Sequence, residues 1–132
     1  MKIVAHLDNS LDAHRVTVET EGTAKKLSIP AKEGDRGSAV NGGELLCLAL
    51  ATCYCNDIYR EAAKRGIEVR RVEVQVEAEF GVEGEPARRI TYSAKLESDA
   101  GEDEIRDLIR FTDTVAEIQN TLRRAVNVSL QN

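Results

Sequence analysis

The apolar run from Leu45 to Cys55 constrains the fold of this chain more than any other feature. It reads LLCLALATCYC, carries no charge and is apolar on every face of the helix that it predicts. Such a helix has to be enclosed by protein on all sides. Eleven residues are too few to cross a bilayer, so the run predicts a buried central helix and not a membrane span.

Composition limits the kind of protein and its partners. The 132 residues, 42% hydrophobic and 31% charged, indicate a globular protein with a single domain over residues 1–132. The net charge of −5 and the lack of a basic stripe exclude nucleic acid and membrane surfaces as partners. The N-terminus has neither the long apolar run nor the cleavage site of a secretory signal. We therefore expect a cytoplasmic protein with reduced thiols.

The three cysteines, Cys47, Cys53 and Cys55, do not form a known metal or redoxin motif. None has C-x-x-C spacing, and the two histidines have no suitably spaced thiol or carboxylate, so we expect neither a metal nor a cofactor. Cys53 and Cys55 point about 200° apart around a helix, and a disulfide between them would require the helix to break.

Periodicity predicts an α+β fold in which antiparallel strands pack around the long buried helix. We expect strands at residues 2–8, 14–20, 26–29, 69–80, 89–97 and 126–130. Helices are expected at 43–64 and 102–111, with 112–120 as a continuation or a second helix. Gly66 is placed to end the first helix in a left-handed cap. Near that end we expect an inward face and a solvated one: inward are Ile58, Ala62 and Ala63, and solvated are Arg60, Glu61, Lys64 and Arg65.

Two motifs make the chain resemble the OsmC/Ohr family, the osmotically induced and organic-hydroperoxide-resistance proteins. The family's helix motif, E-L-L-x-A-A-L-A-[ST]-C, falls on Glu44 to Cys53. Its second motif, C-P-V-S-x-x-L, falls on Ala116 to Leu122, where the frame agrees but alanine replaces the cysteine. The resemblance covers nearly the whole chain and implies an OsmC-like fold and an intertwined homodimer with sites at the subunit interface.

The resemblance also implies a peroxiredoxin-like thiol peroxidase acting in oxidative-stress defence. By position, Cys53 is the thiol that attacks the hydroperoxide, and Ala116 stands where the resolving thiol should be. An external thiol or dithiol would then be the reductant, with Cys55 as a possible auxiliary thiol. The family activates its cysteine with an arginine from the first β-turn, for which Arg15 is our choice. The glutamate that holds this arginine aligns with Gly43, and Glu44, one residue later and displaced by about 100° on the helix, is our candidate for its role.

Simpler interpretations stand beside these roles. Cys53 is also consistent with a small buried core residue, and Cys47 is assigned to core packing. Glu44 most simply serves the first turn of its helix, where a carboxylate meets free N–H groups. The acidic segment Asp113 to Glu117 would raise the pKa of Cys53 if it lay nearby, but a solvated face is the favoured interpretation.

The missing second cysteine leaves an alternative function open. A non-catalytic protein with the OsmC fold would keep the apolar pocket beside the buried helix and bind a small hydrophobic ligand there. Retention of Cys53 at its motif position favours the thiol-dependent reaction, whereas Gly43 and Ala116 favour ligand binding.

Overall fold

Two compact units, Met1–Leu45 and Leu46–Asn132, make up the chain in the computed structural model, which describes all 132 residues. Strands form the first unit, and three helices with a β-hairpin form most of the second. The expectation of a single domain over residues 1–132 stays a prediction.

The N-terminal unit contains a three-stranded antiparallel sheet in the order β1-β2-β3. Its strands are β1 (Ile3–Asn9), β2 (His14–Thr20) and β3 (Thr23–Leu27). Glu21 and Gly22 have φ values of 49° and 82°, as a two-residue type I′ hairpin turn requires. This tight turn pairs Thr20 directly with Thr23. The third strand therefore begins and ends earlier than the expected 26–29.

The central helix α1 runs from Gly42 to Lys64, as the sequence predicts to within a residue. At its start, Glu44 N–H donates to Asn41 Oδ1 (2.9 Å) and Asn41 N–H donates to Glu44 Oε2 (2.8 Å). This reciprocal pair is a capping box. At its end, Gly66 has φ +66°, and Ile67 N–H donates to the Ala62 carbonyl at 2.9 Å. Such a left-handed glycine cap confirms the predicted end of the helix.

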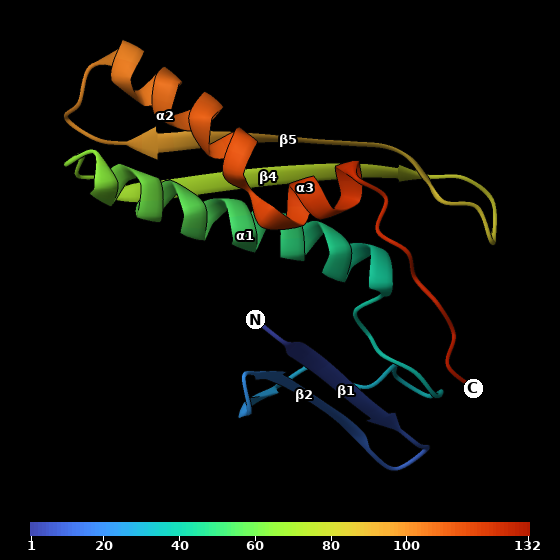
Figure 1. The fold of residues 1–132 in the computed structure, drawn as a ribbon. Coiled ribbons are helices and arrows are strands. Elements are labelled where there is room, and N and C mark those ends of the chain that lie inside the picture. Colours follow the sequence, from blue (N-terminus) through green and yellow to red (C-terminus); the bar gives the residue numbers. More distant parts are fainter. The chain divides into compact units, whose positions relative to one another are not determined.

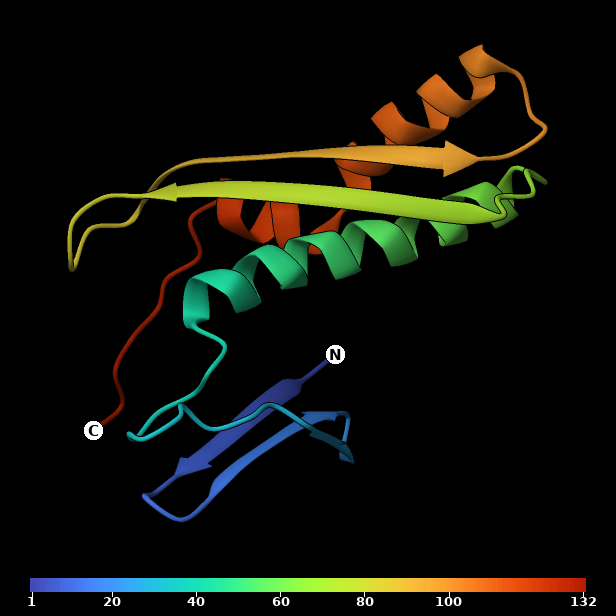
Figure 2. The same ribbon diagram turned by 180° about the vertical axis from the view of Figure 1, so that it is seen from behind.

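A long antiparallel hairpin and three helices form the core of the C-terminal unit. Strands β4 (Arg71–Phe80) and β5 (Ala87–Glu97) pair along their length. Helices α1, α2 (Glu102–Val115) and α3 (Glu117–Arg123) lie on one face of the hairpin (Figures 1 and 2). The buried core comprises Tyr54, Ile58, Ala62, Leu108 and Ala116, packed against alternate residues of both strands. This arrangement confirms the α+β class and the predicted hairpin.

The expected strand at 126–130 is absent. Residues 124–132 form neither helix nor strand, and no backbone hydrogen bond ties residues 126–132 to another segment. The alternating apolar side chains Val126, Val128 and Leu130 are 61%, 93% and 86% exposed. Apolar and polar residues do alternate in this segment, but a strand forms only where the edge of a sheet is available to pair its N–H and C=O groups.

Within the C-terminal unit, α1 is covered on one face and not on every face as the sequence predicts. The covered face buries Leu50, Tyr54 and Ile58 to 2% exposure or less. Leu48 is 59% exposed and Thr52 is exposed as well, because the hairpin and the other two helices cover only one side of α1. No helix in the chain has the combined length and apolar character needed to cross a membrane.

Candidate functional site

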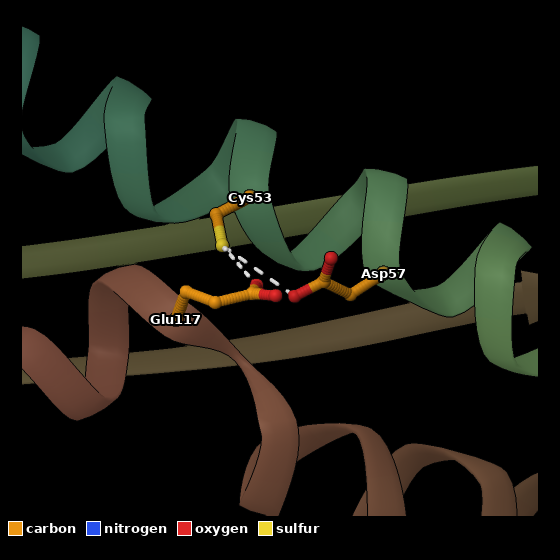
Figure 3. Close-up of side chains that lie close together, drawn as sticks. All are labelled: Cys53, Asp57 and Glu117. Atoms are coloured by element: carbon orange, nitrogen blue, oxygen red, sulfur yellow. Dashed lines mark hydrogen bonds between the residues drawn. The ribbon is translucent and has the colours of Figure 1, made fainter. Parts of the chain in front are cut away.

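A thiol and two carboxylates converge between α1 and α3. Cys53 Sγ donates to Asp57 Oδ2 at 3.5 Å and to Glu117 Oε2 at 3.8 Å. Figure 3 shows the three side chains pointing toward one another, two from α1 and one from α3. Cys53 and Asp57 are four residues apart, which places them on the same face of α1. We call Cys53, Asp57 and Glu117 the thiol–carboxylate cluster.

Glu117 reaches this cluster because the chain breaks its helix immediately before it. Ala116, between α2 and α3, has φ −72° and ψ 109°, an extended conformation, and is fully buried. A side-chain amide then fixes α3 against α1, since Gln119 Nε2 donates to the Leu50 carbonyl at 3.0 Å. The family's second-motif position, Ala116, therefore lies next to a residue that contacts Cys53.

One guanidinium joins the carboxylates of the cluster to each other. Arg60 Nη1 lies 2.8 Å from Asp57 Oδ1 and 3.3 Å from Glu117 Oε1, while its Nε lies 3.0 Å from Glu61 Oε1. Glu61 is also paired with Lys64 at 2.9 Å and is only 4% exposed. The expectation that Glu61 is solvated is wrong, because two adjacent cations let its carboxylate be buried. The expectation that Ala63 faces inward is also wrong, since it lies on the exposed side of α1.

The cluster favours the protonated form of the thiol. Burial raises the pKa of Cys53, and the negative charges of Asp57 and Glu117 raise it further, against a hydrogen bond from the backbone N–H of Ile118. Burial likewise raises the pKa of Asp57, with Glu117 adding to the rise and Arg60 opposing it. At neutral pH Cys53 is therefore held as a thiol, unlike a cysteine activated by a neighbouring cation.

The acidic segment from Asp113 to Glu117 divides between two surroundings. Glu117 contacts Cys53, as the alternative interpretation expected, and its side chain is still 65% exposed, as a solvated face predicts. Asp113 instead accepts a hydrogen bond from the Tyr92 hydroxyl and is ion-paired with Arg123 at 2.6 Å. The two residues differ because the break at Ala116 separates the helices that carry them.

The other residues singled out in the sequence have local partners. Arg15, on β2, is ion-paired with Asp8 at 3.7 Å within the N-terminal unit. Glu44 forms the capping box of α1, the simpler of its two expected roles. Catalytic roles for Arg15 and Glu44 stay predictions.

Cys55 lies on a different side of α1 from Cys53. It borders a hollow of about 280 Å³ lined by residues of α1 and by Val74 of β4, whereas Cys53 faces α3. All three cysteines, Cys47 included, are free. An auxiliary role for Cys55 stays a prediction, and within one chain it would need α1 to open.

The thiol–carboxylate cluster also has the spacing of a shared cation site. Its three donor atoms lie within 4.8 Å of one another, and thiolate with carboxylate is a donor set that Zn²⁺ accepts. The guanidinium of Arg60 already supplies a positive charge to both carboxylates, so we assign no metal here.

Sequence reasoning missed Asp57 and Arg60 as site residues. The spacings Cys53 to Asp57 (i, i+4) and Asp57 to Arg60 (i, i+3) were available signals, because such pairs are neighbours on a helix surface. Glu117 is 64 residues from Cys53 in the chain, and the only signal for it was its place next to Ala116, the position of the family's resolving thiol.

The fold and the cluster together define an α+β domain that presents a half-buried thiol from its central helix. The sequence model of the OsmC-like protein family matches residues 34–131, and the chain therefore belongs to the OsmC-like family. A search of curated proteins gives no match.

Solved structures of low sequence identity share this fold. An OsmC-like protein from Mycoplasma pneumoniae is 21% identical with a TM-score of 0.66, over 92% of this chain and 86% of the other. An organic hydroperoxide resistance protein from Legionella pneumophila is 20% identical with a TM-score of 0.61, over 93% and 90%. A hypothetical protein from Aquifex aeolicus is 16% identical with a TM-score of 0.69, over 96% and 91%.

Proposed function

We propose that this protein reduces organic hydroperoxides through the single thiol of Cys53, as part of oxidative-stress defence. The observation that carries the proposal is that Cys53, at the family's motif position, is half-buried and contacts ionisable groups from two helices. A cysteine serving only as core packing would be enclosed by apolar side chains. Membership of the OsmC-like family and the hydroperoxide resistance protein of similar fold support the same class of reaction.

The proposed cycle needs a reductant from outside the chain. The Cys53 thiol reduces ROOH to ROH and becomes a sulfenic acid. Ala116 offers no thiol to condense with it, and Cys55 lies on another side of the helix. An external thiol therefore forms a mixed disulfide with Cys53 and releases water, and a second thiol equivalent restores Cys53. The cytoplasm, where thiols are kept reduced, is the proposed compartment.

Labelling of the sulfenic acid tests this reaction. The reduced protein is exposed briefly to stoichiometric cumene hydroperoxide with dimedone present, and the intact mass is measured. We expect one dimedone adduct, absent from Cys53→Ser and retained in Cys55→Ser, which is the matched control because the two residues share the helix. Labelling no faster than that of an ordinary free thiol would refute the proposal.

We also propose that the protein is a homodimer. Leu48 and Tyr59 are 59% and 42% exposed and share one face of α1 with Thr52, so this apolar helix face has no cover within the C-terminal unit. A second copy of the chain would cover it. Light scattering should give twice the 14.5 kDa mass of one chain, and a monomer would contradict the proposal.

A second candidate function is binding of a small hydrophobic ligand without catalysis. The hollow of about 280 Å³ beside Cys55, with Ala51 and Val74 in its lining, and the raised pKa of Cys53 favour it. An apolar fluorescent probe should then bind the wild type, and Ala51→Phe, which fills the hollow, should weaken that binding. Absence of binding by the wild type would rule out this candidate.

A further inference from the structure

We propose that Asp57 is the catalytic acid–base of the Cys53 reaction, a role that deepens the proposed hydroperoxide reduction and rests on it. The carboxylate of Asp57 takes the proton of Cys53 as the sulfur attacks. It then gives that proton to the alkoxide that leaves.

Contact geometry places Asp57 in reach of the reacting atom. Its Oδ2 accepts a hydrogen bond from Cys53 Sγ at 3.5 Å. Its other oxygen, Oδ1, is held by Arg60 Nη1 at 2.8 Å, so the two carboxylate oxygens have separate partners. A general base has to lie within hydrogen-bond reach of the proton that it removes, and Asp57 meets this condition. Arg60 acts as a positioning residue, because it orients the carboxylate without touching the sulfur.

The two carboxylates of the cluster differ in how far they are buried. Asp57 is 4% exposed, whereas the Glu117 side chain is 65% exposed and its Oε2 is farther from the sulfur, at 3.8 Å. A buried base keeps its orientation and exchanges its proton with water less readily than an exposed one. Of the two, Asp57 is therefore the one suited to hold a proton between the two steps.

The charges around Cys53 disfavour a thiolate in the resting protein and favour transfer of the proton during the reaction. Asp57 on α1 and Glu117 on α3 are the ionisable groups in contact with Cys53, and Arg60 pairs with both carboxylates. Their negative charges disfavour a permanent thiolate. The raised pKa of Asp57 makes its carboxylate a better proton acceptor, which brings donor and acceptor closer in proton affinity. Deprotonation that accompanies attack avoids the unfavourable thiolate.

The step balances without a further reactant. Sulfur donates an electron pair to the terminal peroxide oxygen, which bears the proton, so that an S–O bond forms and the O–O bond breaks with the alkoxide as leaving group. Cys53 is oxidised from thiol to sulfenic acid, and the hydroperoxide ROOH is reduced to the alcohol ROH. The sulfur proton passes through Asp57 to the leaving oxygen, the hydroperoxide's own proton stays on the sulfenic oxygen, and Asp57 ends the step as it began.

Two reactions of the same thiol separate proton transfer from simple charge repulsion. Reaction with cumene hydroperoxide needs a proton for the leaving alkoxide, whereas alkylation by iodoacetamide releases iodide, which needs none. Rates of both are measured at pH 7 for the wild type, Asp57→Asn and Asp57→Glu, in a background with Cys47 and Cys55 replaced by serine. Asp99→Asn is the matched control, because Asp99 is an exposed carboxylate two residues after the end of β5.

We expect Asp57→Asn to slow the hydroperoxide reaction about 100-fold and alkylation by much less, because alkylation loses the same base but needs no proton for its leaving group. Asp57→Glu, which keeps a carboxylate, should recover part of the hydroperoxide rate, and Asp99→Asn should change neither rate. An Asp57→Asn rate with hydroperoxide equal to or above that of the wild type would overturn the role, because Asp57 would then only suppress the thiolate.

Other outcomes remain distinguishable. If Asp57→Asn does not fold, as circular dichroism would show, the wild type in D₂O decides the question. Proton transfer predicts a larger slowing of the hydroperoxide reaction than of alkylation, and equal effects would overturn it. A wild type that does not react with hydroperoxide overturns the proposed function, and this role with it, whereas an active wild type with an unaffected Asp57→Asn overturns only this role.

Discussion

Replacement of Arg60 by methionine tests whether one guanidinium holds the site together. Methionine keeps much of the length and the apolar stem of the side chain but removes its charge. The change leaves the carboxylates of Asp57 and Glu61, each 4% exposed, without the cation that lies 2.8 Å and 3.0 Å from them. Glu61 keeps Lys64 at 2.9 Å, so Asp57 bears most of the loss.

The expected destabilisation is intermediate and depends on pH. Removing one partner of a fully buried ion pair costs about 3–5 kcal/mol, and we expect about 2 kcal/mol here at pH 8 because Arg60 is partly exposed and Lys64 remains. The folded-state pKa of Asp57 is already raised, and loss of Arg60 raises it further. A carboxyl group whose pKa is raised in the folded state contributes stability at low pH, and this contribution is lost as the pH rises through the folded-state pKa. The difference in the free energy of unfolding between the wild type and Arg60→Met should therefore become smaller as the pH falls toward 5.

Urea denaturation at pH 8 and pH 5 measures both effects. The control is Arg70→Met, because Arg70 pairs with Asp99, which is 94% exposed, and an exposed pair contributes about 0–1 kcal/mol. A loss for Arg60→Met no larger than that for Arg70→Met, or a loss that is the same at both pH values, would refute the reasoning.

Three further predictions concern the core, the helix cap and the thiol. Ile58→Ala should lower the free energy of unfolding by about 3 kcal/mol in urea titrations, because Ile58 is fully buried, and a loss below about 1 kcal/mol would contradict the assigned core. Gly66→Ala should cost about 1–2 kcal/mol because Gly66 has φ +66°, whereas Gly42→Ala, at a position without positive φ or a close neighbour, should cost nothing measurable. Alkylation of Cys53 should reach half its maximal rate at a higher pH in the folded protein than in the urea-unfolded chain, since the folded state raises its pKa. Mass spectrometry of a variant lacking the other two cysteines measures this, and a lower midpoint in the folded protein would contradict the assigned contacts.

Local pattern in the sequence was sufficient for most of the elements. The alternation from Arg71 to Phe80 predicts β4, and the apolar run with Gly66 beyond it predicts both the body and the end of α1. These features depend on neighbours within one turn or one strand, so the sequence contains what decides them. The family resemblance likewise needed only the sequence, and the match over residues 34–131 confirms membership of the OsmC-like family.

The surroundings of Cys53 required the tertiary structure. Glu117 is 64 residues from Cys53, and it reaches the sulfur only because the chain turns at Ala116. Glu61 reads as a solvated residue in a helical pattern, yet it is buried because Arg60 and Lys64 neutralise it. Charge and periodicity along the chain do not reveal such pairings, since each depends on which elements pack together. The sequence by itself determined the elements and the position of the thiol, and packing decided that carboxylates contact this thiol, because contacts between distant segments form only when the chain folds.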